Sequence, residues 1–97
     1  MHTIVEANVL CDEEQELIRA AAANHGSLEV AIRSCTRGRA VWAGRKSFFD
    51  PADRCVSERY ISLLAHLQQL ELIREAGANR CYELTNFGWE LSRRLTR

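Results

Sequence analysis

The stretch YISLLAHLQQLELIREAGANRCYELTNFGWELSRRL, from Tyr60 to Leu95, carries the clearest structural pattern in this sequence. Its first part has apolar residues at helical spacing, and the run LELIR then changes to an extended pattern. Residues 76–79 can form a tight turn before CYEL returns as a second strand, and Thr85 can cap a last helix in which Phe87, Leu91 and Leu95 pack inward. We therefore expect a helix, a two-stranded hairpin and a helix in this order.

The first of these helices is expected to begin well before Tyr60. Asp50 is a suitable cap and Pro51 suits the first helical position, so the helix should run from there to about Leu70. Its apolar side chains follow one stripe: Val56, Tyr60, Leu63, Leu64, Leu67 and Leu70. The polar stripe on the opposite side consists of Arg59, Ser62, His66 and Gln69.

The N-terminal half is expected to add a helix and a hairpin. Asp12 with Gln15 three positions later fits a capping box, which predicts a helix from about residue 13 to residue 24. Residues 28–35 fit either a strand or a helix face, and we favour a strand because residues 36–39 resemble a turn and extended patterns follow. The result is a hairpin between residues 28 and 49, and hence a small α+β domain.

Length and composition predict one domain that covers residues 1–97. With 46% hydrophobic residues the chain can form its own core. It has no run of about 18 to 20 apolar residues, and the N-terminal stretch lacks the pattern of a secretory signal. We therefore expect a cytoplasmic protein without a membrane partner.

The four cysteines do not indicate a metal site. Cys11, Cys35, Cys55 and Cys81 form no CxxC pair and have no histidine at a metal-binding spacing, so we expect small, mostly buried hydrophobic side chains and no bound metal. Nor does the sequence contain a nucleophile motif, a glycine loop for phosphate or an acid–base pair. No enzyme activity, cofactor or small-molecule substrate is predicted.

The net charge of zero hides an uneven distribution. Residues 1–30 carry six acidic residues and one arginine, a net charge of −5, whereas residues 31–60 carry seven basic and three acidic residues, a net charge of +4. One interpretation is a basic surface that meets phosphate. The other is that the acidic helix and the basic segment neutralise one another.

Two segments resemble known sequence patterns. The run LxxLxxLELIREAG followed by YELTNFGWELSRRL resembles the helix, wing and closing helix of winged-helix proteins. The matching positions are Leu64, Leu67, Leu72, Ile73, Tyr82, Leu84, Thr85, Gly88 and Leu91. The whole run from Asp12 to Leu95 is similar to an uncharacterised winged-helix-like module at the C-terminal end of assorted bacterial proteins. An ordinary winged helix has a short helix before its recognition helix, where this sequence predicts an extended hairpin.

The resemblance implies binding to double-stranded DNA as a regulator, with the helix after residue 50 in a groove. Arg59 would contact a guanine edge or a phosphate, Gln69 an adenine edge, and Ser62 and His66 would add hydrogen bonds. Arg54 would meet the backbone. The alternative is that these side chains form an ordinary solvated helix face.

Two further groups of basic residues are candidate nucleic-acid contacts. The first surrounds the aromatic residues Trp42, Phe48 and Phe49, which either stack on bases or fill the core, and consists of Arg37, Arg39, Arg45 and Lys46. The second flanks the C-terminal hairpin turn and consists of Arg74 and Arg80, beside Glu75 and Glu83.

The competing hypothesis is a protein–protein interaction module. The neutral net charge and the acidic first helix favour a protein partner, for example if the chain is a phage or mobile-element inhibitor of a host defence complex, of anti-CRISPR type. A homodimer is compatible with both hypotheses, because Trp89 is either an exposed interface anchor or packed against the hairpin.

Overall fold

Three helices and five antiparallel strands form a small α+β domain in the computed structural model, which describes residues 10–31, 39–48, 50, 52–77 and 80–95. The helices are α1 (Asp12–Ala23), α2 (Arg54–Gln69) and α3 (Asn86–Leu95). The strands are β1 (Ser27–Ala31), β2 (Ala40–Ala43), β3 (Lys46–Phe48), β4 (Ile73–Glu75) and β5 (Cys81–Leu84). The predicted α+β class is thus confirmed.

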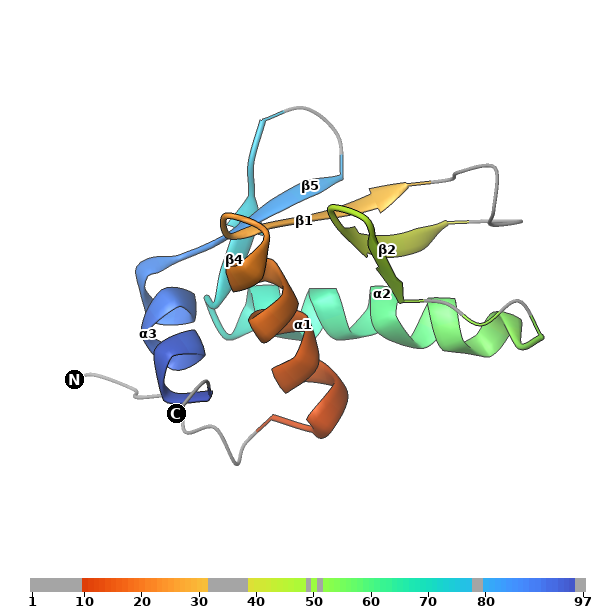
Figure 1. Ribbon diagram of the computed structural model, residues 1–97, viewed down its shortest axis with the longest axis horizontal. Helices are drawn as coiled ribbons and strands as arrows, with labels where there is room; N and C mark the ends of the chain where they lie inside the picture. Colours follow the sequence, from red (N-terminus) through yellow and green to blue (C-terminus); the bar gives the residue numbers. More distant parts are fainter. Residues whose placement is uncertain (1–9, 32–38, 49, 51, 78–79, 96–97) are drawn as a thin grey trace.

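The strands form one sheet in the order β3-β2-β1-β5-β4, so the N-terminal strand β1 lies at its centre (Figure 1). Glu29 of β1 faces Trp42 on one side and Cys81 on the other. The two hairpins, β2–β3 and β4–β5, therefore extend the sheet in opposite directions. The strand interpretation of the ambiguous segment is confirmed for Ser27–Ala31, whereas residues 32–35 and the expected turn at residues 36–38 lie outside the described residues.

The middle of the chain holds one more strand than the sequence predicted. The expected second arm of the hairpin is divided by Gly44 and Arg45 into β2 and β3, which pair with each other. Gly44 has a φ of +62°, as the first central position of a type II′ turn requires. A two-residue turn of this kind suits the twist of the adjacent strands, and this is why the chain reverses here.

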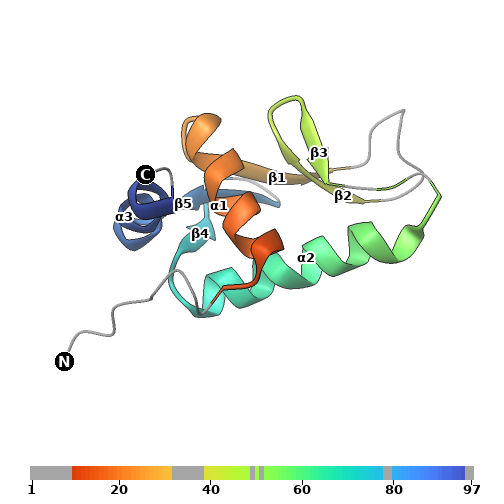
Figure 2. The same ribbon diagram turned by 60° about the horizontal axis from the view of Figure 1, so that its bottom comes forward.

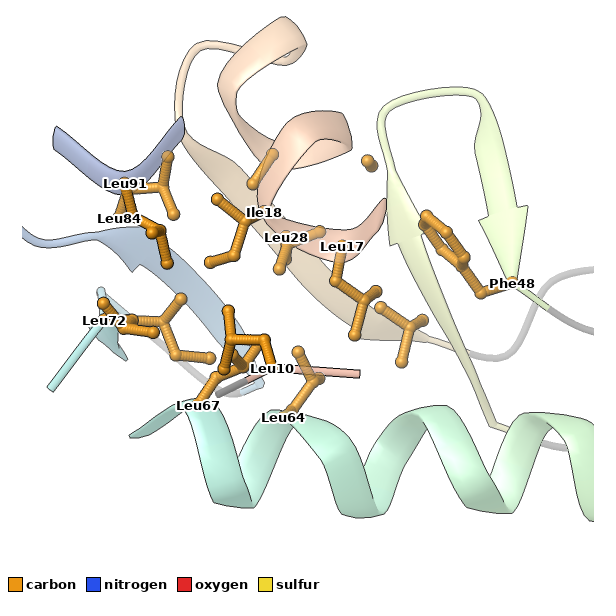
Figure 3. Packing of buried hydrophobic residues seen from close by; sticks show 14 of the residues in the cluster. Leu10, Leu17, Ile18, Leu28, Phe48, Leu64, Leu67, Leu72, Leu84 and Leu91 are labelled. Atoms are coloured by element: carbon orange, nitrogen blue, oxygen red, sulfur yellow. The ribbon is translucent and has the colours of Figure 1, made fainter. Parts of the chain in front are cut away.

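The three helices cover one face of the sheet and enclose the hydrophobic core (Figure 2). Leu17 and Ile18 of α1 and Leu67 of α2 are completely buried there. Leu91 of α3 and Leu28 of β1 complete the contact between the layers (Figure 3). Each such side chain contributes about 1.5–3 kcal/mol by leaving water. None of the helices in the described part of the chain is long and apolar enough to cross a membrane.

Two predicted helix starts are wrong by one and three residues. α1 is capped by Cys11 instead of Asp12, because the Glu14 carboxylate accepts the Cys11 amide hydrogen at 3.3 Å. α2 is capped by Asp53 instead of Asp50, since Asp53 accepts the amide hydrogen of Cys55 at 2.9 Å. Asp50 forms a local turn before the helix, in which its carboxylate accepts the amide hydrogen of Ala52.

The last helix begins as predicted, but its aromatic residues do not lie as predicted. The Thr85 hydroxyl accepts the amide hydrogen of Gly88 at 3.2 Å and so caps α3. Phe87 does not pack inward, because it lies in the first turn of α3, before the turn that carries the buried Leu91, and it is 51% exposed. Trp89 is half-buried, and a Cβ added to Gly26 would lie 2.6 Å from its ring. Trp89 therefore packs on the turn between α1 and β1.

Candidate functional site: the α2 stripe and the groove at the end of the hairpin

The predicted polar stripe of α2 is exposed, but the first turn of α1 lies beside it. A guanidinium nitrogen of Arg59 donates to Glu13 at 2.5 Å. The Nδ1 atom of His66 lies 2.5 Å from a carboxylate oxygen of Glu14. Ser62 donates its hydroxyl to the carbonyl of Glu58 in its own helix, which leaves Gln69 as the member of the stripe without a described side-chain partner.

Glu14 has two structural tasks at this contact. Its side chain is only 4% exposed, and its two oxygens are used by the Cys11 amide and the His66 ring. A carboxylate buried to this extent needs such partners, because leaving it without them would cost several kcal/mol. His66 is therefore engaged in holding α1 against α2.

A further acidic residue of α1, Glu16, binds the β2–β3 hairpin. Lys46 lies 3.3 Å from the Glu16 carboxylate and 5.3 Å from the centre of the Phe48 ring. The Phe48 ring is in turn 5.0 Å from Tyr60 of α2. Burial raises the pKa of the Tyr60 hydroxyl above 10.0, and the negative charges of Glu16 and Glu13 raise it further.

The described basic residues of the C-terminal hairpin and of the middle segment do not form one surface. Arg74 of β4 donates to Glu83 of β5 at 2.7 Å. Arg80 and Arg39 are exposed beside the end of β1, whereas Arg45 lies at the opposite end of the sheet, in the β2–β3 turn. Two candidates cannot be placed, since Arg37 lies outside the described residues and only the backbone position of Arg54, at the start of α2, is described.

The two described aromatic residues of the middle segment are not available for base stacking. Trp42 and Phe48 are buried, with 5% and 4% of their surface exposed, and Phe49 lies outside the described residues. The expectation of buried cysteines is wrong for Cys11 and Cys55, which are exposed because they lie at helix starts. Among the described residues no group of three or more histidine, cysteine and acidic side chains could hold a metal ion.

Sequence analysis missed a groove at the base of the C-terminal hairpin. It measures about 690 Å³ and lies where the end of α2, the β4–β5 hairpin and the start of α3 meet. The residues that give it its character are Glu71, Ile73, Arg74, Glu83, Phe87 and Trp89. Phe87 is the one large hydrophobic side chain that is exposed in the described part of the chain. The available signal was an apolar residue two positions after the Thr85 cap, in the first turn of the helix.

Backbone contacts make this groove rigid. Thr85 donates its hydroxyl to the carbonyl of Glu71 and its amide hydrogen to the carbonyl of Leu72. α3 approaches so closely that a Cβ on Gly88 would lie 2.2 Å from the Leu72 carbonyl oxygen. The end of α2 and the start of α3 are therefore held in one arrangement.

Glu71 lies at the edge of this groove in an unfavourable backbone conformation. Its φ is +60°, in the left-handed region that favours glycine. The amide of Leu72 donates to Leu67 and that of Glu71 to Gln68, which is the Schellman motif that ends α2. A glutamate in the position where glycine is preferred costs about 1–2 kcal/mol. Outliers of this kind concentrate at functional sites.

Comparisons with protein-family models, with curated proteins and with solved structures found no significant match.

Proposed function

We propose that this chain is a protein–protein interaction module whose partner binds the groove between α2, the β4–β5 hairpin and α3. The observation that carries the proposal is the exposed Phe87 ring beside a rigid groove. An aromatic side chain in such a position is a common anchor of protein interfaces. Leaving an apolar ring in water has no benefit for folding, so a partner that covers it supplies a reason for its position.

The charge arrangement supports a protein partner more than DNA. Four of the side chains expected to meet nucleic acid have carboxylate partners on another element: Lys46, Arg59, His66 and Arg74. A phosphate would have to compete with these carboxylates. An inhibitor of a host defence complex is one form that a protein-binding function would take.

Binding of double-stranded DNA is the second candidate function. It is favoured by Arg39 and Arg80, which are exposed at the same end of the sheet and make no ion pair with the described residues. The winged-helix resemblance belongs to this candidate. The order of α2, the β4–β5 hairpin and α3 agrees with it, whereas three strands separate α1 from α2.

One experiment compares the two candidates. The immobilised full-length chain, a Phe87→Ser variant and an Arg39→Ala/Arg80→Ala variant are each exposed to an extract of the native host and, separately, to duplex DNA at low salt. The proposal predicts a protein that is captured by the parent chain and the arginine variant but lost with Phe87→Ser. Capture that is independent of Phe87, or DNA retention that is lost only with the arginine variant, would contradict it.

A further inference from the structure

We infer that the groove accepts an extended, basic segment of the partner, which adds to the sheet as a sixth strand beside β4. This inference rests on the proposed function and specifies the kind of partner. It follows from three features of the described residues: a free sheet edge, a surplus of carboxylates and an exposed aromatic ring at the end of that edge.

β4 is an edge strand with hydrogen-bonding groups that face outward. The amide of Thr85 donates to Leu72 and that of Ala76 to Cys81, so residues 72, 74 and 76 direct their backbone groups toward β5. In an antiparallel ladder the intervening residues point the other way. Glu75 is exposed and thus presents its N–H and C=O groups at an edge where the described chain has no neighbouring strand, whereas Ile73 directs its groups the same way but is only 2% exposed. An added strand would satisfy the outward groups of Glu75.

The charges beside this edge select a basic partner. Glu71 and Glu83 line the groove, and Glu75 is exposed at the end of β4. Arg74 is the basic residue among the groove residues, and it is already bonded to Glu83. A segment with lysine or arginine near Glu71 and Glu75 would therefore be attracted, whereas an acidic segment would be repelled.

The apolar part of the groove adds a second requirement. Phe87 is exposed, and Trp89 and Ile73 line the groove next to it. Successive side chains of a strand point to opposite faces. A segment that alternates basic and apolar residues can therefore place an apolar side chain on Phe87 while its basic residues, on the other face, meet Glu75, whose neighbour Arg74 lines the groove.

The opposite edge of the sheet offers a control. β3 is also an edge strand, but Lys46 there is bonded to Glu16, and Phe48 is buried. The end of α1 offers a second control, because His25 has a φ of +57° in the same kind of helix end as Glu71. His25 is not among the residues that line the groove.

The test is an NMR titration of the ¹⁵N-labelled full-length chain with blocked synthetic heptapeptides. One peptide alternates lysine and valine, a second alternates glutamate and valine, and a third is the lysine peptide with proline at its central position. We expect shifts at the amides of Ile73, Glu75 and Phe87 with the first peptide only. Equal binding of the glutamate peptide, or shifts confined to β3, would overturn the inference.

Matched variants make the result specific. Glu75→Pro removes an outward amide hydrogen and should reduce the affinity for the lysine peptide at least tenfold, while Ser47→Pro on β3 should leave it unchanged.

Glu71→Gly and His25→Gly should both raise the melting temperature, because each replaces a residue in the left-handed region by glycine. Glu71→Gly alone should weaken binding, by about threefold for one exposed charge. If both glycine variants bind the lysine peptide as the parent chain does, Glu71 does not attract the basic residues of the partner.

The outcome can be separated from that of the proposed function. A partner that is lost with Phe87→Ser but retained by Glu75→Pro would leave the protein-binding function in place and refute the added strand. Loss with both variants supports both statements.

Discussion

At the scale of single residues, Gly88 shows how one position holds two elements together. Its Cα lies against the start of β4, and an added methyl group would meet the Leu72 carbonyl at 2.2 Å and Leu84 at 3.1 Å. Helix interiors usually disfavour glycine. Here the close approach of α3 to the backbone before β4 requires it.

We therefore expect Gly88→Ala to lower the free energy of unfolding by about 2–3 kcal/mol through overpacking. Gly77→Ala is the matched control, since a Cβ there meets nothing within 4 Å and only its φ of +68° opposes the change. Its cost should be about 1 kcal/mol. Urea denaturation of both variants gives the comparison, and equal costs would show that the packing at Gly88 is not tight.

At the scale of elements, the start of α2 depends on which aspartate caps it. Asp53→Ala should lower the free energy of unfolding by about 1 kcal/mol, because the amide of Cys55 at the helix start loses its acceptor. Asp50→Ala removes only the acceptor of the Ala52 amide in an exposed turn. We therefore expect Asp50→Ala to lower the free energy of unfolding by less than about half of the loss caused by Asp53→Ala. Thermal unfolding of the two variants measures the difference. A larger loss of stability in Asp50→Ala would place the helix start at Asp50, as the sequence alone suggested.

The contact between α1, α2 and β3 should be visible in the titration of Tyr60. Its pKa is raised above 10.0 by burial and then by the charges of Glu16 and Glu13. In a Glu13→Gln/Glu16→Gln variant the pKa should move toward 10.0 without reaching it, because burial remains. Tyrosinate absorbance measures this, with Tyr60→Phe to assign the signal. An unchanged pKa would mean that α1 does not lie against Tyr60.

The same shift links stability to alkaline pH. The unfolded chain loses the Tyr60 proton near pH 10.0, before the folded chain does. The contribution of Tyr60 to stability is therefore complete below pH 10 and is lost as the pH rises through the folded pKa.

At the scale of the whole molecule, charges that are separated in the sequence are neutralised in the fold. Glu13, Glu14 and Glu16 of α1 bind Arg59, His66 and Lys46, which come from α2 and β3. Each exposed pair contributes little to stability, roughly 0–1 kcal/mol. The larger consequence of this pairing is that the described part of the basic middle segment does not present a continuous positive surface.

Removing the acidic partners should uncover an affinity for DNA. Glu13→Gln/Glu16→Gln raises the net charge from 0 to +2 and frees Arg59 and Lys46, so retention of duplex DNA at low salt should rise roughly tenfold and disappear as salt is added. Glu71→Gln/Glu90→Gln changes the net charge equally at other places and should have a weaker effect. If the two double variants bind DNA equally, net charge and not pairing controls retention.

Much of the secondary structure could be predicted from local patterns. The apolar stripe of α2, the strand alternation around Leu28 and Val30 and the Thr85 cap each depend on neighbours within a few positions. The errors lie where a local rule had two solutions, as at Asp50 and Asp53, both of which can cap a helix. For the site, sequence analysis identified the exposed stripe of α2 but not what lies beside it.

The sequence by itself determined the number and order of the helices and the position of the C-terminal hairpin, because hydrophobic spacing and capping act over one or two turns. Only the tertiary structure decided which charges meet and where an apolar side chain stays exposed. Glu13 and Arg59 are separated by 46 positions, and Glu14 and His66 by 52. Phe87 stays exposed at the start of α3, although Gly88 and Leu91, one and four positions later, are buried. Such contacts depend on how the layers pack, which no local pattern contains.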